Sequence, residues 1–154
     1  MSMAKTEVFI WLHLPRTEAE KASSRAAILA CLEGNEALCN IMLITAEGAL
    51  ESELSFGFEH DVALNGIINA IIQSGAKIIR FSLQLPSSFT GVANVYDARD
   101  AGGEISDILQ EIEGVNDAGV RNNGTVHVEC GWHDPDRILT LIKQRLLRNK
   151  NKVQ

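Results

Sequence analysis

Apolar and polar residues in the first half of the chain follow two periods, which alternate in a fixed order. Apolar residues at every second position are typical of a half-buried strand. They predict single strands over residues 7–14 and 77–85, and a hairpin made of residues 38–45 and 50–58. Between these strands, apolar residues at every third or fourth position predict two helices. We therefore expect the order β-α-β-β-α-β.

Both helices carry recognisable end signals. Thr17 and Glu20 form a capping box, which predicts a helix that begins there and runs to Glu33. Asp61 is expected to cap the second helix, which ends at Gly75. The first helix is expected to pack on the sheet through one face made of Ala22, Ala26, Leu29 and Leu32.

The second half repeats the first in a shorter form. Residues 108–118 (ILQEIEGVNDA) match residues 28–37 (ILACLEGNEA) with one residue inserted. The shared pattern is typical of the end of an amphipathic helix, followed by a glycine in the left-handed conformation and the start of a strand. The elements predicted for this half are a strand (91–96), a helix (104–113), a hairpin (115–121 and 125–130) around an Asn-Asn-Gly turn, and a helix (135–148).

Two copies of a split β-α-β unit define the expected fold class. It is α+β, with two tandem ferredoxin-like (βαββαβ) repeats whose antiparallel sheets carry their helices on one face. We expect a first repeat over residues 1–86, a shortened second repeat over residues 90–150, and a tail over residues 151–154. Because the second repeat lacks a sixth element, its sheet is expected to leave one edge open for pairing.

Composition narrows the function classes. The chain has 154 residues, of which 45% are hydrophobic and 22% charged, as in a soluble globular protein, and it contains no stretch of the ~20 apolar residues that a membrane span needs. No secretory signal is visible, so we expect a cytoplasmic protein. With 14 basic against 20 acidic residues, a net charge of −6 gives no general attraction to nucleic acid or to a membrane.

Two local features of composition remain. The last twelve residues hold five basic side chains and no acid, which suits either the dipole of a C-terminal helix or a phosphate-binding tail. The three cysteines include no C-x-x-C pair, which is typical of reduced cytosolic thiols. We expect Cys31 and Cys39 to be small buried hydrophobic residues.

The second repeat resembles heavy-metal-associated domains, in the segments 108–118, 123–128 and 134–142. The resemblance implies a ferredoxin-like fold, but that family binds copper through a cysteine pair between the first strand and the first helix. This chain has Asp97-Ala98-Arg99-Asp100 there in the second repeat, and His13-Leu14-Pro15-Arg16 in the first. The resemblance is thus to domains of this type that lack the C-x-x-C motif, and copper transport is not implied.

The same loop also carries a second resemblance. Residues 96–105 are similar to the strand-to-helix turn of amino-acid-sensing ACT domains, in which backbone amides at a helix N-terminus meet a ligand carboxylate. The resemblance implies a ligand site formed by Asp97, Arg99, Asp100, Gly102 and Gly103. The alternative is that the two glycines only provide a flexible entry to the helix.

The segment 127–134 holds the densest chemistry in the sequence. His127, Cys130 and His133 are candidate ligands of a transition metal, provided that the chain bends at Gly131. Otherwise these are solvated strand residues and a buried thiol, and no cofactor is expected. Trp132 either anchors a partner or packs over the start of the following helix.

No nucleophile with a matched base is visible in the sequence, and no phosphate-binding loop, so an enzyme is not expected. We expect a non-catalytic interaction module that binds a protein partner or a second copy of itself. The alternatives are a sensor of small amino-acid-type ligands and an atypical metal carrier.

Overall fold

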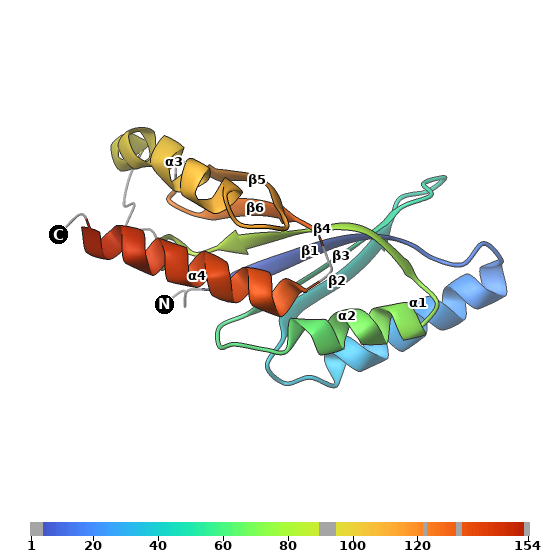
Figure 1. Ribbon diagram of the computed structural model, residues 1–154. Helices are drawn as coiled ribbons and strands as arrows, with labels where there is room; N and C mark the ends of the chain where they lie inside the picture. The colour runs from blue at the N-terminus through green and yellow to red at the C-terminus, as the bar shows by residue number, and fades with distance from the viewer. Residues whose placement is uncertain (1–4, 90–94, 122, 132–133, 153–154) are drawn as a thin grey trace. The chain divides into compact units, whose positions relative to one another are not determined.

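The computed structural model describes residues 5–89, 95–121, 123–131 and 134–152 (Figure 1). These residues form an α+β protein with a ferredoxin-like sheet, as predicted. The elements in chain order are β1 (Thr6–His13), α1 (Glu18–Glu33), β2 (Cys39–Thr45), β3 (Ser52–Phe58), α2 (Leu64–Gln73), β4 (Lys77–Leu85), the 3-10 turn η1 (Ser87–Phe89), α3 (Val95–Gln110), β5 (Val115–Val120), β6 (Val126–Cys130) and α4 (Pro135–Lys152).

The chain divides into two compact units, of which one is Glu7–Phe81 and the other joins Met1–Thr6 to Ser82–Gln154. The strand order is β2-β3-β1-β4-β6-β5. The first unit therefore has the ferredoxin-like order β2-β3-β1-β4, and the second unit has the order β4-β6-β5, because β4 crosses the boundary between the units. The predicted repeat boundaries, residues 1–86 and 90–150, stay a prediction.

Because β4 belongs to the strand order of both units, the order of elements in the second half differs from the predicted one. The first strand expected over residues 91–96 is wrong at residues 95 and 96, because α3 begins at Val95, and the rest of it lies outside the described residues. The strand β4 takes the place of that first strand and has a neighbour on each side. The edge that was expected to be open there is consequently paired, and the edge strands are β2 and β5.

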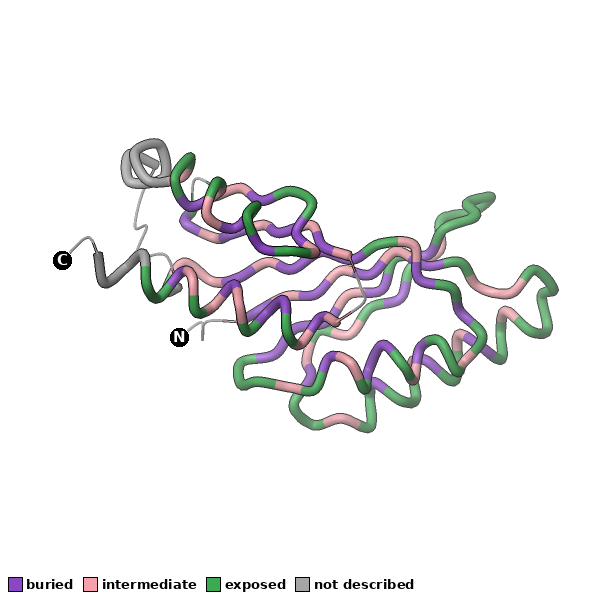
Figure 2. The backbone as a smooth tube through the Cα atoms, viewed as in Figure 1, coloured by how far each residue is buried: buried purple, intermediate pink, exposed green. Residues whose placement is uncertain are grey.

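In the unit Glu7–Phe81, α1 and α2 contact each other and lie on one side of the strands (Figures 1 and 2). Alternate residues of β1 point to these helices, so that Val8, Ile10 and Leu12 are buried. The helix α1 buries Ser24, Ile28 and Leu32, a stripe with a four-residue spacing. The expected face is therefore wrong for Ala22 and Ala26, which are exposed. The expectation that Cys31 is buried is wrong as well, because Cys31 is also exposed.

The unit that contains Ser82–Gln154 buries residues of β4, β6 and both of its helices, for example Leu85, Ile105, Val128 and Ile142. The strands β5 and β6 are antiparallel and close at Gly124, which has a positive φ of 86°.

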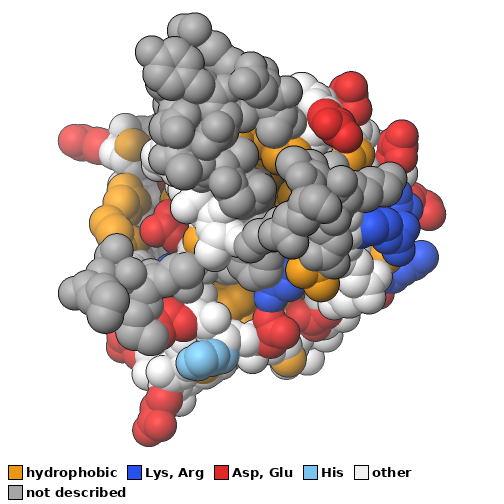
Figure 3. Space-filling model, turned by 90° about the vertical axis from the view of Figure 1, so that its left-hand side faces the viewer, with side chains coloured by type: hydrophobic (Ala, Val, Ile, Leu, Met, Phe, Trp, Pro, Cys, Tyr) orange, Lys and Arg blue, Asp and Glu red, His pale blue; other side chains and the backbone are white. Residues whose placement is uncertain are grey.

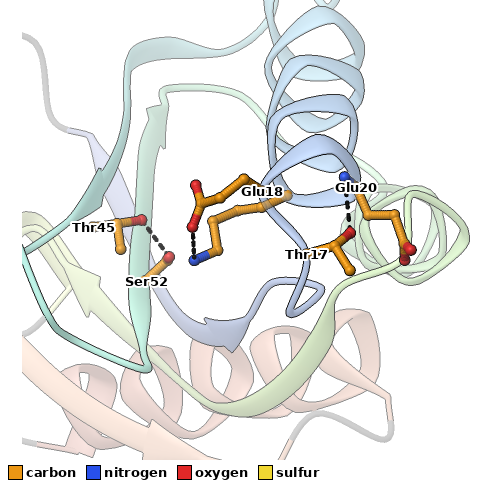
Figure 4. A network of polar contacts seen from close by, with 6 residues as sticks. Thr17, Glu18, Glu20, Thr45 and Ser52 are labelled. Carbon is orange, nitrogen blue, oxygen red and sulfur yellow. Dashed lines mark hydrogen bonds and ion pairs between the residues drawn. The ribbon is translucent and has the colours of Figure 1, made fainter.

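Helix ends follow the sequence signals at some positions only. The Thr17 hydroxyl accepts a hydrogen bond from the Glu20 backbone at 3.3 Å, and Figure 4 shows this cap. The Asp134 carboxylate caps α4 in the same way, accepting from the Arg137 backbone at 3.2 Å. At the third of these helix starts, α2 begins at Leu64, three residues after Asp61, and its N-cap residue, Ala63, makes no side-chain cap. The cap expected at Asp61 stays a prediction.

Charge and hydropathy complete the description. In the view of Figure 3, acidic side chains are spread over the described surface, whereas the basic ones lie mostly toward one side. None of the helices in the described residues is both long enough and apolar enough to cross a bilayer.

Candidate interaction surface

The five residues of the expected ligand site, 97, 99, 100, 102 and 103, all lie within α3. The expectation of a strand-to-helix turn is thus wrong. Asp97 lies in the first turn of α3, whereas the amides of the other four residues lie beyond it and bond to the carbonyl four residues earlier, so they do not converge on a carboxylate as those of a helix N-terminus do. A Cβ on Gly102 would lie 3.6 Å from the Cβ of Val120, an ordinary contact between α3 and β5. Ligand binding by the five residues stays a prediction.

His127 and Cys130 point to opposite faces of β6. Cys130 lies on the buried face with Val126 and Val128, whereas His127 is half-buried on the other face with Glu129. Burial, and secondly the charge of Glu129, raise the pKa of the Cys130 thiol to about 12. Since a metal binds the thiolate, Cys130 is poorly suited to be a ligand at neutral pH.

The remaining candidates of this segment are not placed. Trp132 and His133 lie outside the described residues. Within the described part of the chain, no three His, Cys, Asp or Glu side chains come together in a group that could hold a metal ion. The His127 Nδ1 atom is buried without a hydrogen-bond partner.

Exposed apolar side chains gather on the hairpin β2–β3. Met42 is 52% exposed, Ile44 is 53% exposed and Leu50, in the connecting loop, is 87% exposed. The other large apolar side chains of the described residues with comparable exposure are Ile72 and Leu147, on two different helices. One hairpin therefore carries three of these five side chains.

The strand register explains why these side chains face solvent. Leu43 of β2 pairs with Leu54 of β3, and both side chains are buried. Because successive residues of a strand point to opposite faces, the two neighbours of Leu43 along β2, Met42 and Ile44, point away from the core. Met42 is opposite Ser55, and Ile44 is opposite Glu53.

Polar contacts hold the hairpin in place. The hydroxyls of Thr45 and Ser52 are 2.5 Å apart where the two strands end, as Figure 4 shows. The Arg25 guanidinium on α1 donates a hydrogen bond to the Leu43 carbonyl of β2. In the loop, Gly48 has a φ of 77°, which favours glycine, and the Ala49 amide donates to the Ala46 carbonyl at 3.0 Å. These contacts give the loop a defined backbone that presents Leu50.

A shallow hollow lies on the same sheet, beside Met42. The register of β2 shifts between Cys39 and Met42, and Asn40 has a positive φ of 53°, so the strand bulges there. Gly57, opposite Cys39, contributes no side chain. The hollow measures about 150 Å³ and is lined by Glu7, Phe9, Asn40, Met42, Ser55, Phe56 and Gly57.

The charged residues of the hairpin are all acidic. Residues 39–58 include Glu47, Glu51 and Glu53, and no Lys or Arg. The sequence analysis missed this surface, although a signal was present. Residues 41–44 (IMLI) are four consecutive apolar residues, and a strand with one solvated face should alternate.

No family model and no curated protein matches the chain. Among the solved structures that are similar to it are the following three. The ligand-free regulatory subunit of aspartate kinase from Thermus thermophilus is 10% identical, with a TM-score of 0.37, and the match covers 96% of this chain and 93% of that one. The N-terminal soluble domains of Bacillus subtilis CopA are 18% identical, with a TM-score of 0.38, covering 95% and 92%. The N-terminal extension of Cupriavidus metallidurans CzcP is 22% identical, with a TM-score of 0.35, covering 92% and 96%.

Proposed function

We propose that this chain is a non-catalytic interaction module, which associates with protein through the hairpin β2–β3. The observation that carries the proposal is the concentration of Met42, Ile44 and Leu50 on one exposed hairpin. Single exposed apolar residues are ordinary on a protein surface, whereas a group of them indicates a contact with another molecule.

The energetics support the same function. Burial of an exposed large aliphatic side chain contributes roughly 1.5–3 kcal/mol. The half-exposed Met42 and Ile44 would contribute less than this each, and Leu50 nearly all of it. A few kcal/mol from three side chains is enough to make the difference between a weak encounter and a micromolar complex.

The hairpin favours side-chain docking over the addition of a partner strand to its edge. The strand β2 is an edge strand, but its Leu43 carbonyl already accepts a hydrogen bond from Arg25. The bulge between Cys39 and Met42 further interrupts the row of backbone groups that an added strand would need.

The test compares two variants of the full chain. The hairpin variant replaces Met42 and Ile44 with Thr and Leu50 with Ser, and the control is Ile72→Thr, an apolar residue of the same unit that is 40% exposed. Native mass spectrometry reports self-association, and capture from the lysate of the native cell reports partners. We expect the wild type and the control to bind a protein or a second copy, and the hairpin variant to bind it at least tenfold more weakly. A wild type that stays monomeric up to about 100 µM and captures nothing, or a hairpin variant that binds as well as the wild type, would contradict the proposal.

A further inference from the structure

The two most exposed large apolar side chains of the described residues lie in opposite electrostatic surroundings. Leu50 is 87% exposed, and the charged residues of its hairpin are all acidic. Leu147, on α4, is 59% exposed, and the charged residues from position 143 to the end of the chain are all basic. Both leucines remain exposed in the folded chain.

The exposed face of α4 has a regular composition. Its exposed residues recur at helical spacing and include no acid: Arg137, Thr140, Gln144, Leu147 and Arg148. Lys150 and Lys152 continue the positive charge within the same helix. The last turns of α4 therefore carry one exposed apolar side chain, Leu147, next to the exposed Arg148, in a stretch of sequence whose charged residues are all basic; Arg145 in this stretch already pairs with Glu111 at 3.8 Å.

We propose that the hairpin β2–β3 of one copy binds the C-terminal turns of α4 of a second copy. The inference rests on the proposed function and names its partner. Leu147 would be buried among the side chains of Met42, Ile44 and Leu50, while the basic side chains of α4 face the glutamates of the hairpin. Complementary charge around an apolar centre is the ordinary arrangement of a specific protein interface.

This contact joins two different surfaces. Two copies can make it twice, hairpin to helix in both directions, and so close a twofold dimer. Where only a single contact forms, each copy keeps one free hairpin and one free helix end, and association continues to a closed ring or an open chain of copies. Because the facing charges are exposed, association is also expected to weaken as salt rises, since the Debye length falls from about 10 Å at 0.1 M to about 3 Å at 1 M.

The test exchanges charge between the two surfaces. One variant carries Glu51→Lys and Glu53→Lys on the hairpin, and the other carries Arg148→Glu and Lys150→Glu on α4. The control, Arg121→Glu with Arg137→Glu, makes the same net charge change as the α4 variant at two exposed positions outside these turns. Sedimentation velocity at about 50 mM and about 500 mM salt gives the mass of each species.

We expect the wild type and the control to form assemblies at low salt that dissociate at high salt. Each charge variant alone should associate at least tenfold more weakly. An equal mixture of the two should regain association, because the unchanged hairpin of one variant meets the unchanged helix of the other.

A mixture that fails to associate, or association of the wild type that strengthens with salt, would overturn the proposal, and the latter result would favour an apolar contact between two identical surfaces. A wild type that is monomeric at both salt concentrations also overturns it. If that monomer still captures a different protein through its hairpin, the proposed function stands and only the self-association fails.

Discussion

The hairpins β2–β3 and β5–β6 are the corresponding parts of the two predicted repeats, and their buried sides follow one plan. Each pair is antiparallel and has one irregularity in its register, in the first half of the earlier strand. In each, two apolar residues face each other across the strands on the core side. The pairs are Leu43 with Leu54 and Ala118 with Val128, and all four side chains are buried.

The opposite sides of these hairpins differ in the earlier strand, since the later strand of the first hairpin carries the polar Glu53 and Ser55 there. Met42 and Ile44 are exposed in the first hairpin, whereas Asp117, His127 and Glu129 take the equivalent side of the second. The fold thus needs apolar residues on the buried side only, because polar residues satisfy the other side equally well in the second repeat. The apolar residues exposed in the first repeat therefore call for an explanation outside the fold, which association supplies.

The largest expected difference between the two predicted repeats is in the reactivity of their thiols toward alkylation. Cys31 is exposed, whereas the pKa of Cys130 is raised from 9.0 to about 12, so at a given pH its thiolate fraction is about a thousandfold below that of an unperturbed thiol. Timed alkylation of the native protein, read by peptide mass spectrometry, should modify Cys31 and leave Cys130 unmodified until the chain unfolds.

The raised pKa of Cys130 also sets a pH dependence. The folded chain holds this proton more tightly than the unfolded chain, so the contribution of Cys130 to stability is complete below pH 9.0 and is lost as the pH rises toward about 12. A Cys130→Ala variant should lose less stability than the wild type over that interval in urea unfolding. Equal alkylation rates for Cys31 and Cys130 in the native state would contradict the assignment.

The next largest difference is expected in the free energy of unfolding, when the glycine of the repeated sequence motif is replaced in one repeat or the other. Gly114 has a φ of 99°, and a Cβ there would lie 2.8 Å from Cδ1 of Ile138, whereas Gly34 has a φ of −73°. Gly114→Ala should lower the free energy of unfolding by about 3 kcal/mol, from the left-handed conformation and the crowding together. Gly34→Ala should change it by less than about 1 kcal/mol.

Chemical denaturation of the two variants measures both values. Similar losses for the two would show that the shared motif ends in the same way in both repeats, against the conformations described.

This pair of glycines also shows what the sequence could predict. The motif placed a glycine after each helix, but only Gly114 adopts the expected left-handed conformation. Predictions from neighbouring residues in the sequence were confirmed where a local feature decides the structure. The cap at Thr17 and the bounds of β4 are as predicted.

Predictions failed where tertiary pairing decides. The first strand of the second repeat was expected at residues 91–96, because β4 had already been assigned to the first repeat, and no local signal indicates that one strand serves both. The helix α1 contains small residues on several faces, so its buried stripe through Ser24 was not distinguishable from one through Ala22 and Ala26. The candidate surface was missed for a related reason, since exposure at Ile44 depends on the register.

The helix caps of the two repeats predict a smaller and equal effect. Thr17→Ala and Asp134→Ala each remove a side chain that accepts a hydrogen bond from a first-turn amide. Each should lower the free energy of unfolding by about 1 kcal/mol. Thr17→Ser and Asp134→Asn keep an acceptor and should recover most of the loss, as urea unfolding would show. A loss for the alanine variants that the conservative variants do not recover would indicate a role other than capping.

The smallest effect on stability is expected for substitutions of the exposed residues of β2. This effect decides whether these residues contribute to the fold or to binding. Ile44→Thr replaces a side chain that is 53% exposed with another β-branched residue, so the free energy of unfolding should change by less than about 0.5 kcal/mol. The matched control is Leu43→Thr on the buried side of the same strand, which should cost several times more because it places a hydroxyl in the core. If Ile44→Thr instead cost as much as Leu43→Thr, the folded chain itself would account for Ile44, and the contrast between the hairpins would no longer indicate an interaction surface. A stable Ile44→Thr variant that associates less would mean that Ile44 contributes to binding and not to the fold.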